Sequence, residues 1–251
     1  MSHANKVAIV TGAGRNIGEA IAHRLADDHS SIAVVDLDKE RAESVVADLI
    51  GRGTTAAPFV CDVSIPDQIQ KTVNSIYSHF GRIDILVNNV AISDNKNILD
   101  IDLTTWQKTL DITLTAPFYF GKCFAEKLVL DGKPGNIVNV SSTTGYFGRG
   151  RAIAYAAAKG GVVNLTRAMA IQLAEHNIRV NSVVPNKIGS PVGKDEFDPT
   201  RPIVNLRNRA GVPNDLANAV AFLVSDKSDF IVGADLFVDG GCSIIMPGGS
   251  S

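Results

Sequence analysis

The chain has 251 residues, 45% of them apolar and 20% charged, and its formal net charge is −2. This composition predicts a globular protein with a substantial core and argues against intrinsic disorder. The balance of 24 basic and 26 acidic residues lacks the positive excess expected of a nucleic-acid-binding protein. No apolar run is long enough to span a membrane, and the N-terminus shows no signal-peptide pattern. We therefore expect no nucleic acid or membrane partner.

The three cysteines are scattered along the chain, at Cys61, Cys123 and Cys242. An odd number without a regular spacing does not suggest a disulfide framework. Reduced thiols are typical of cytoplasmic proteins, so the sequence predicts a cytoplasmic location. The five histidines show no metal-ligand spacing, and we expect no metal site.

Short apolar runs alternate with amphipathic segments along the chain. The runs predict seven strands, at Val7–Val10, Ile32–Val35, Ala56–Cys61, Ile83–Val87, Ile137–Val140, Ile178–Val183 and Ala234–Val238. The other segments predict helices at Ile17–Asp27, Lys39–Ile50, Ile65–Phe80, Trp106–Leu130, Ala154–Ala174 and Asn214–Leu223. This alternation predicts a doubly wound α/β fold, with a mostly parallel sheet covered by helices on both faces. We expect residues 1–251 to form a single domain.

The one long irregular region is the loop at about residues 186–212. A loop of this length in a compact domain is usually functional, and we expect it to contact the substrate. Its basic residues could attract an acidic substrate or simply form a solvated face; they are Lys194, Arg201, Arg207 and Arg209.

A glycine-rich segment, Thr-Gly-Ala-Gly-Arg-Asn-Ile-Gly at residues 11–18, joins the first predicted strand to the first helix. Glycines allow a tight turn that brings backbone N–H groups close to a pyrophosphate, and the helix N-terminus adds partial positive charge. An ordinary turn is the alternative. The flanking strand and helix favour a dinucleotide site contacted by Gly12, Arg15, Asn16, Ile17 and Gly18.

Asp36 ends the second predicted strand. A carboxylate at this position can accept hydrogen bonds from ribose hydroxyls and would repel a 2′-phosphate, which favours NAD over NADP. The adjacent Leu37 supplies no compensating cation, whereas Arg15 could serve a 2′-phosphate. The alternative is that Asp36 only caps the helix that starts near Asp38.

Tyr155 and Lys159 are four residues apart on a predicted helix and therefore share a face. A neighbouring ammonium favours the tyrosinate, so such a pair could exchange a proton with an alcohol or a carbonyl compound. Ser141 and Ser142 end a predicted strand, at the edge where open α/β sheets bind ligands. A solvated helix face and a turn serine are the ordinary alternatives.

Together these features resemble the short-chain dehydrogenase/reductase family in its single-domain form. The resemblance runs from about Lys6 to Gly241. It is carried by segments 11–18, Asp36, Cys61–Val63, Asn88–Ala91, Ile137–Ser142, Tyr155–Lys159, Asn181–Pro185 and Val238–Gly241.

The resemblance implies a Rossmann-type sheet and an NAD-dependent enzyme that transfers a hydride between the nicotinamide and a secondary alcohol or ketone. Tyr155 would be the general acid/base, Lys159 would lower its pKa and bind the nicotinamide ribose, and Ser142 would hold the substrate oxygen. Further cofactor contacts would come from Asp62, Val63, Asn89, Pro185, Ile188 and Ser190. Family members usually form homotetramers through their long helices.

Two departures from the family pattern affect the site. Asn16 replaces a glycine of the phosphate turn, although asparagine tolerates positive φ. Thr113 stands where the family has an asparagine that helps to hold a water linking the lysine to solvent. These departures motivate an alternative hypothesis, a catalytically impaired dinucleotide sensor, which the intact Ser142, Tyr155 and Lys159 disfavour.

Overall fold

The computed structural model describes residues 5–194, 196 and 202–245. Its strands form one sheet in the order β3-β2-β1-β4-β5-β6-β7, and each neighbouring pair is parallel. The strands are β1 (Val7–Thr11), β2 (Ser31–Asp36), β3 (Ala56–Val60), β4 (Ile85–Asn88), β5 (Gly135–Val140), β6 (Ile178–Pro185) and β7 (Asp235–Val238). The predicted seven-stranded doubly wound fold is therefore confirmed.

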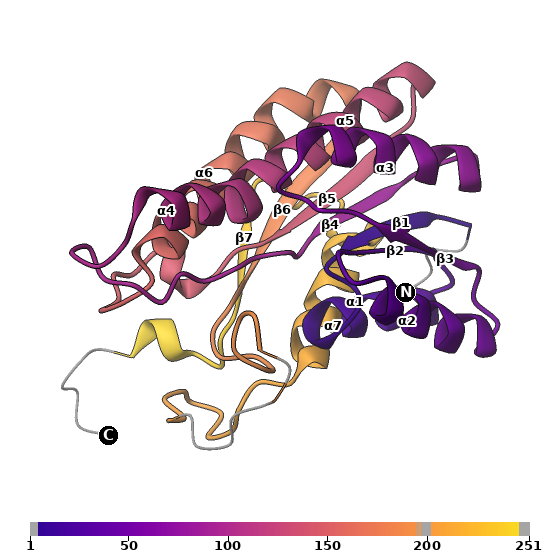
Figure 1. The fold of residues 1–251 in the computed structure, drawn as a ribbon. Coiled ribbons are helices and arrows are strands. Elements are labelled where there is room, and N and C mark those ends of the chain that lie inside the picture. The colour runs from indigo at the N-terminus through magenta and orange to yellow at the C-terminus, as the bar shows by residue number, and fades with distance from the viewer. Residues whose placement is uncertain (1–4, 195, 197–201, 246–251) are drawn as a thin grey trace.

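Helices cover both faces of the sheet (Figure 1). One layer contains α1 (Asn16–Asp27), α2 (Lys39–Gly51) and α7 (Pro213–Leu223). The other contains α3 (Pro66–Phe80), α4 (Leu103–Leu110), α5 (Ala116–Asp131) and α6 (Ile153–Leu173). This two-layer covering explains why the strands are apolar on both sides.

Each layer buries its own apolar core against the sheet. In the first, Ile21 and Leu25 of α1 pack with Val220 of α7. In the second, Val73 of α3 packs with Phe124 of α5. Burial of such side chains stabilises a fold by about 1.5–3 kcal/mol each. The two cores fix the sheet from both sides and so give its carboxyl edge a rigid base.

The predicted helix Trp106–Leu130 differs from the structure. The helical segment starts at Leu103 and is divided by a π-helical turn at Asp111–Thr115, in which the Ala116 N–H bonds to the Asp111 carbonyl oxygen. Pro117 follows this turn and has no N–H to donate to the carbonyl of the residue four positions earlier. The wider turn accommodates the missing donor and places Thr113 in the irregular segment.

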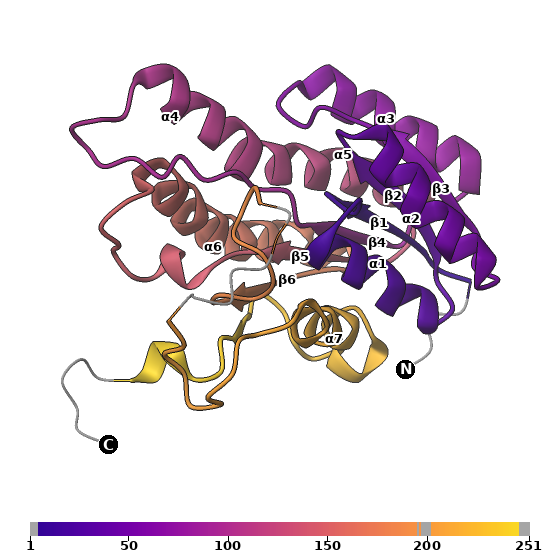
Figure 2. The same ribbon diagram turned by 60° about the horizontal axis from the view of Figure 1, so that its bottom comes forward.

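The loop after β6 and the segment after β7 lie together beyond the carboxyl edge of the sheet (Figures 1 and 2). Residues 195 and 197–201 of this loop, including Arg201, lie outside the described part. Across the residues that the structure describes, no helix combines the length and apolar character that a membrane span requires. Within the same residues, no group of three or more His, Cys, Asp and Glu side chains could hold a metal ion.

Candidate active site

A cleft of about 1310 Å³ opens at the carboxyl edge of the sheet. The sheet order reverses direction between β1 and β4, which is where doubly wound proteins bind ligands. Every residue that the sequence proposed for cofactor binding or catalysis lines this cleft: Gly12, Arg15, Asn16, Ile17, Gly18, Asp36, Leu37, Asp62, Val63, Asn89, Ser142, Tyr155, Lys159, Pro185, Ile188 and Ser190. Segments from β1 to the loop after β6 thus contribute to one site, and the individual roles remain predictions.

The glycine-rich segment forms a tight turn into α1. Gly12 has φ +63°, a conformation that glycine adopts without steric cost. A Cβ on Gly18 would lie 1.9 Å from the Gly12 carbonyl oxygen, so only glycine fits against the turn. The Arg15 side chain does not cap α1. The first-turn N–H groups of α1 therefore face the cleft in the arrangement that suits an anion such as pyrophosphate.

Asn16 adopts the left-handed conformation, with φ +53°, in place of the family's glycine. Its side chain reaches the loop after β6, where Oδ1 accepts a hydrogen bond from the Ser190 N–H at 3.4 Å. A Cβ on Gly189 would lie 2.3 Å from the same oxygen. The substitution therefore preserves the turn and adds a contact between the glycine-rich turn and the loop after β6.

Asp36 lies at the end of β2 and is partly exposed in the cleft. Its two carboxylate oxygens accept hydrogen bonds from the N–H of Gly14 at 2.8 Å and of Asp38 at 3.0 Å. The cap of α2 is a different residue, since Asp38 accepts from the Arg41 N–H at 3.1 Å. A carboxylate offers about four acceptor sites, so Asp36 retains capacity for ribose hydroxyls.

A nicotinamide dinucleotide requires a close approach to the backbone for its pyrophosphate and an acceptor for its ribose hydroxyls. The glycines keep the turn tight, since a Cβ would meet neighbouring atoms at 3.0 Å on Gly12 and at 1.9 Å on Gly18, and the partly exposed Asp36 carboxylate lies at the end of the adjacent strand β2. The catalytic candidates lie farther along the same cleft, after β5. The residues present therefore fit this class of cofactor.

Ser142, Tyr155 and Lys159 come together although they belong to two elements. Ser142 follows β5 and starts a short 3₁₀ turn, where its hydroxyl accepts from the Thr144 N–H at 3.2 Å. Tyr155 and Lys159 lie on α6, and the Lys159 ammonium is 5.7 Å from the centre of the Tyr155 ring. The three side chains are only 8%, 5% and 2% exposed, respectively.

The Lys159 ammonium donates a hydrogen bond to the Val140 carbonyl oxygen at 2.6 Å. Burial disfavours its charged form and lowers the pKa of Lys159 to about 7. The Val140 carbonyl at the end of β5 therefore holds the Lys159 amine in place. Burial brings the pKa of this amine into the neutral range.

Burial raises the pKa of Tyr155, because the buried site disfavours a phenolate. Hydrogen bonding with Ser142 and the positive charge of Arg149 act in the opposite direction, with smaller effects. The lowering of this pKa by Lys159 stays a prediction, and burial favours the neutral form of this amine in the chain alone.

Thr113 is fully buried in the π-helical turn. Its hydroxyl accepts a hydrogen bond from the Ile92 N–H at 3.2 Å and donates one to the Ile92 carbonyl oxygen at 3.3 Å. These bonds fix the segment after β4 that passes the cleft. The hydroxyl is thus engaged with the backbone, and not with Lys159.

Asp94 is a further candidate that no sequence motif indicates. The residue before α6, Ala152, has no side-chain cap and has φ +65°. The Asp94 carboxylate replaces the cap from a distant loop: it accepts from the Tyr155 N–H at 3.1 Å and the Ala154 N–H at 3.5 Å. It therefore positions the first turn of α6, on which Tyr155 lies. In the sequence Asp94 lies between Ser93 and Asn95, and these neighbours do not indicate that it caps a distant helix.

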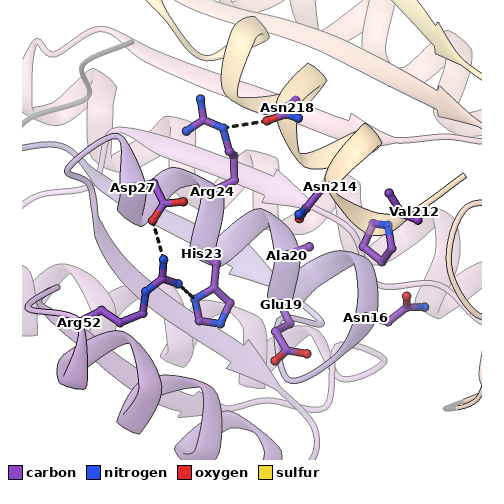
Figure 3. A pocket seen from close by; sticks show the side chains of 11 residues that line it. Asn16, Glu19, Ala20, His23, Arg24, Asp27, Arg52, Val212, Asn214 and Asn218 are labelled. Carbon is purple, nitrogen blue, oxygen red and sulfur yellow. Dashed lines mark hydrogen bonds and ion pairs between the residues drawn. The ribbon is translucent and has the colours of Figure 1, made fainter.

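A second, smaller pocket of about 530 Å³ lies between α1 and α7 (Figure 3). Several of its polar groups bind one another: Arg52 contacts Asp27 and His23 at 2.8 Å each, and Arg24 bonds to Asn218 at 2.9 Å. Because these polar groups already have partners, we place the functional site in the larger cleft.

Known proteins resemble this chain over nearly its whole length. A family model described as enoyl-(acyl carrier protein) reductase matches residues 12–243. The cis-4-hydroxycyclohexanecarboxylate dehydrogenase of Sinomonas cyclohexanicum is 36% identical over 246 residues, covering 96% of this chain and 98% of that protein. A short-chain type dehydrogenase/reductase from Mycobacterium marinum superimposes with a TM-score of 0.88 at 31% identity, covering 96% of each chain. An NAD⁺-bound xylitol dehydrogenase gives a TM-score of 0.88 at 32% identity, covering 96% of this chain and 100% of that chain.

The fold, the cleft and these similarities define an oxidoreductase of the doubly wound α/β class. The chain belongs to the short-chain dehydrogenase/reductase family.

Proposed function

We propose that the protein is an NAD-dependent oxidoreductase that interconverts a secondary alcohol and a ketone. The observation that carries this proposal is the grouping of Ser142, Tyr155 and Lys159 in the cleft that also contains Asp36 and the glycine turn. The similarity to a hydroxycyclohexanecarboxylate dehydrogenase and to a xylitol dehydrogenase supports alcohol groups as the reacting class.

When bound, a nicotinamide dinucleotide supplies or accepts the hydride. Ser142 donates a hydrogen bond to the substrate oxygen and fixes its position. In ketone reduction Tyr155 gives its hydroxyl proton to that oxygen, and in alcohol oxidation the tyrosinate takes the proton back. Lys159, held at the Val140 carbonyl, stabilises the tyrosinate when it carries its own proton.

The preference for NAD over NADP rests on Asp36. Its carboxylate is partly exposed in the cleft and would repel a 2′-phosphate. The NAD⁺ in the similar xylitol dehydrogenase supports the same assignment. The ratio of kcat/KM for NAD and NADP measures it directly.

A second candidate function is a dinucleotide sensor without turnover. It is favoured by Thr113, whose hydroxyl is engaged with Ile92 and does not reproduce the family's asparagine. The intact Ser142, Tyr155 and Lys159 favour the enzyme, because a binding protein has no chemical need of all three.

The deciding experiment is the Tyr155→Phe variant. We expect it to bind NADH as the unmodified protein does and to lose turnover by about a hundredfold or more, since general acid/base catalysis contributes about 10²–10⁴-fold. Tyr119→Phe, on α5, is the matched control and should retain turnover. Unchanged activity of Tyr155→Phe would refute the assignment, and NAD binding without turnover of any alcohol or ketone would favour the sensor.

We also propose a single-domain, cytoplasmic homotetramer. Large apolar side chains remain exposed on three helices of one layer, at Leu103 of α4, Leu130 of α5 and Ile171 of α6. Helices with such faces are suited to pack against copies of the chain. Sedimentation velocity tests the assembly state, and a monomer at micromolar concentration would contradict it.

A further inference from the structure

The acidic residues that line the cleft all lie at one of its ends, together with Arg15 and Arg41, whereas the charged residues that line the other end are cations. Asp36 and Asp38 follow β2, and Asp62 follows β3. The cations Lys187 and Lys194 follow β6, and Arg149 lies between β5 and α6. Because β2 and β3 lie on one side of β1 while β5 and β6 lie on the other, the acids and these cations occupy opposite ends of the cleft.

Arg149 is exposed and lines the end of the cleft that contains Tyr155. Within the described residues its side chain makes no hydrogen bond or ion pair, and the same holds for Lys194. Lys187 differs, because its ammonium donates to the Pro202 carbonyl oxygen at 2.8 Å. Two cations at this end are thus available to a ligand.

The guanidinium of Arg149 also acts on the reacting group. Its positive charge favours the tyrosinate and so opposes the effect of burial, which raises the pKa of Tyr155. Arg149 and Tyr155 both line this end of the cleft. A ligand that presents its oxygen to Tyr155 would therefore lie within reach of Arg149.

The remainder of this end is apolar or neutral. Apolar side chains line it at Ile92, Phe147, Val192 and Ile245. No described residue that lines this end is acidic. Asp94, on the segment after β4, is bound by N–H groups of α6 and does not line the cleft. The surroundings suit a molecule with an apolar body and a negative charge.

We propose that the substrate is a secondary alcohol or ketone that carries a carboxylate, and that Arg149 is the residue that binds this group, assisted by Lys194. This inference rests on the proposed dehydrogenase function. It specifies the substrate class, which the similar proteins leave open, since one is named for a hydroxy acid and another for a neutral polyol.

The test uses matched pairs of substrates with the full-length protein and NAD. Each pair contains a hydroxy acid and its uncharged derivative: cis-4-hydroxycyclohexanecarboxylate with its methyl ester, and 3-hydroxybutyrate with its amide. Values of kcat/KM are compared for the unmodified protein, Arg149→Gln, Arg149→Lys and Lys194→Gln. Arg151→Gln is the control, because Arg151 is equally exposed but does not line the cleft.

We expect the acid of each pair to be the better substrate and Arg149→Gln to reduce its kcat/KM by about tenfold to a hundredfold, as for a charge-assisted hydrogen bond. The uncharged partner should change by less than about threefold, Arg149→Lys should restore part of the loss, and Arg151→Gln should have no effect. A preference for the uncharged partners, or an equal loss for both members of a pair, would overturn the inference and leave the dehydrogenase assignment intact. Absence of turnover for every compound, with NADH still bound, would instead overturn the proposed function.

Discussion

The hydroxyl of Thr113 makes two hydrogen bonds with one residue, accepting from the Ile92 N–H and donating to its carbonyl oxygen. A fully buried side chain of the π-helical turn thereby holds the segment that leads from β4 along the cleft. The position is a structural support in this chain.

We expect Thr113→Val to lower the free energy of unfolding by about 1–3 kcal/mol, because it leaves two backbone groups of Ile92 without their buried partner. Urea denaturation measures the loss. Thr113→Ser, which keeps the hydroxyl, should lose less. The pH at which activity is half-maximal should not move in either variant, and a shift of this pH in Thr113→Val would show that the hydroxyl takes part in proton exchange.

Lys159 should make the stability of the cofactor-free protein depend on pH. Burial lowers its pKa from 10.5 to about 7, so between these values the unfolded chain binds a proton that the folded chain lacks. The resulting destabilisation is greatest below pH 7 and decreases as the pH rises towards 10.5.

Lys159→Met removes this titration. The stability of the variant relative to the unmodified protein should therefore be higher at pH 6 than at pH 9, with a slope of at most about 1.4 kcal/mol per pH unit. Thermal unfolding at several pH values gives the comparison. The exposed Lys71→Met serves as control and should show no such trend; a flat difference for Lys159→Met would contradict the lowered pKa.

Asp94 should act on catalysis through the position of Tyr155. Asp94→Ala removes the acceptor of the Tyr155 N–H and should destabilise the protein by about 1 kcal/mol, as loss of a helix cap does. We expect kcat to fall by about tenfold while the KM for NAD stays constant. Asp94→Asn retains an acceptor oxygen and should recover most of kcat. An equal loss in both variants would show that the charge, and not the cap, is needed.

Asp36→Asn tests cofactor choice. Removing the negative charge should reduce the preference for NAD over NADP by about tenfold, measured as the ratio of the two kcat/KM values. One of the hydrogen bonds from Gly14 and Asp38 is lost as well, so stability should fall by about 1 kcal/mol. Asp38→Asn keeps the cap of α2 and should change the ratio much less. If both variants alter the ratio equally, general electrostatics of the cleft would explain the preference better than Asp36 does.

The sequence predicted the strands and most helices well because each short apolar run is flanked by turn residues. It failed between α4 and α5, where the absent N–H of Pro117 widens a turn without interrupting the apolar pattern. The residues of the cleft were also predictable, because the glycine turn, Asp36 and Tyr155 occupy ends of parallel elements. Asp94 was not, since it caps α6 from a loop 61 residues before Tyr155. Such long-range contacts leave no local pattern.

The candidate catalytic residues follow β5 directly or lie on α6, and the two cores of the protein hold these elements in place, whereas Arg149, Phe147 and Val192 lie on connecting segments. Substitutions in those segments should change the free energy of unfolding little, because few of their side chains pack in the core. In evolution, a few substitutions on these segments could therefore change the substrate while the residues proposed to carry out the reaction stay the same.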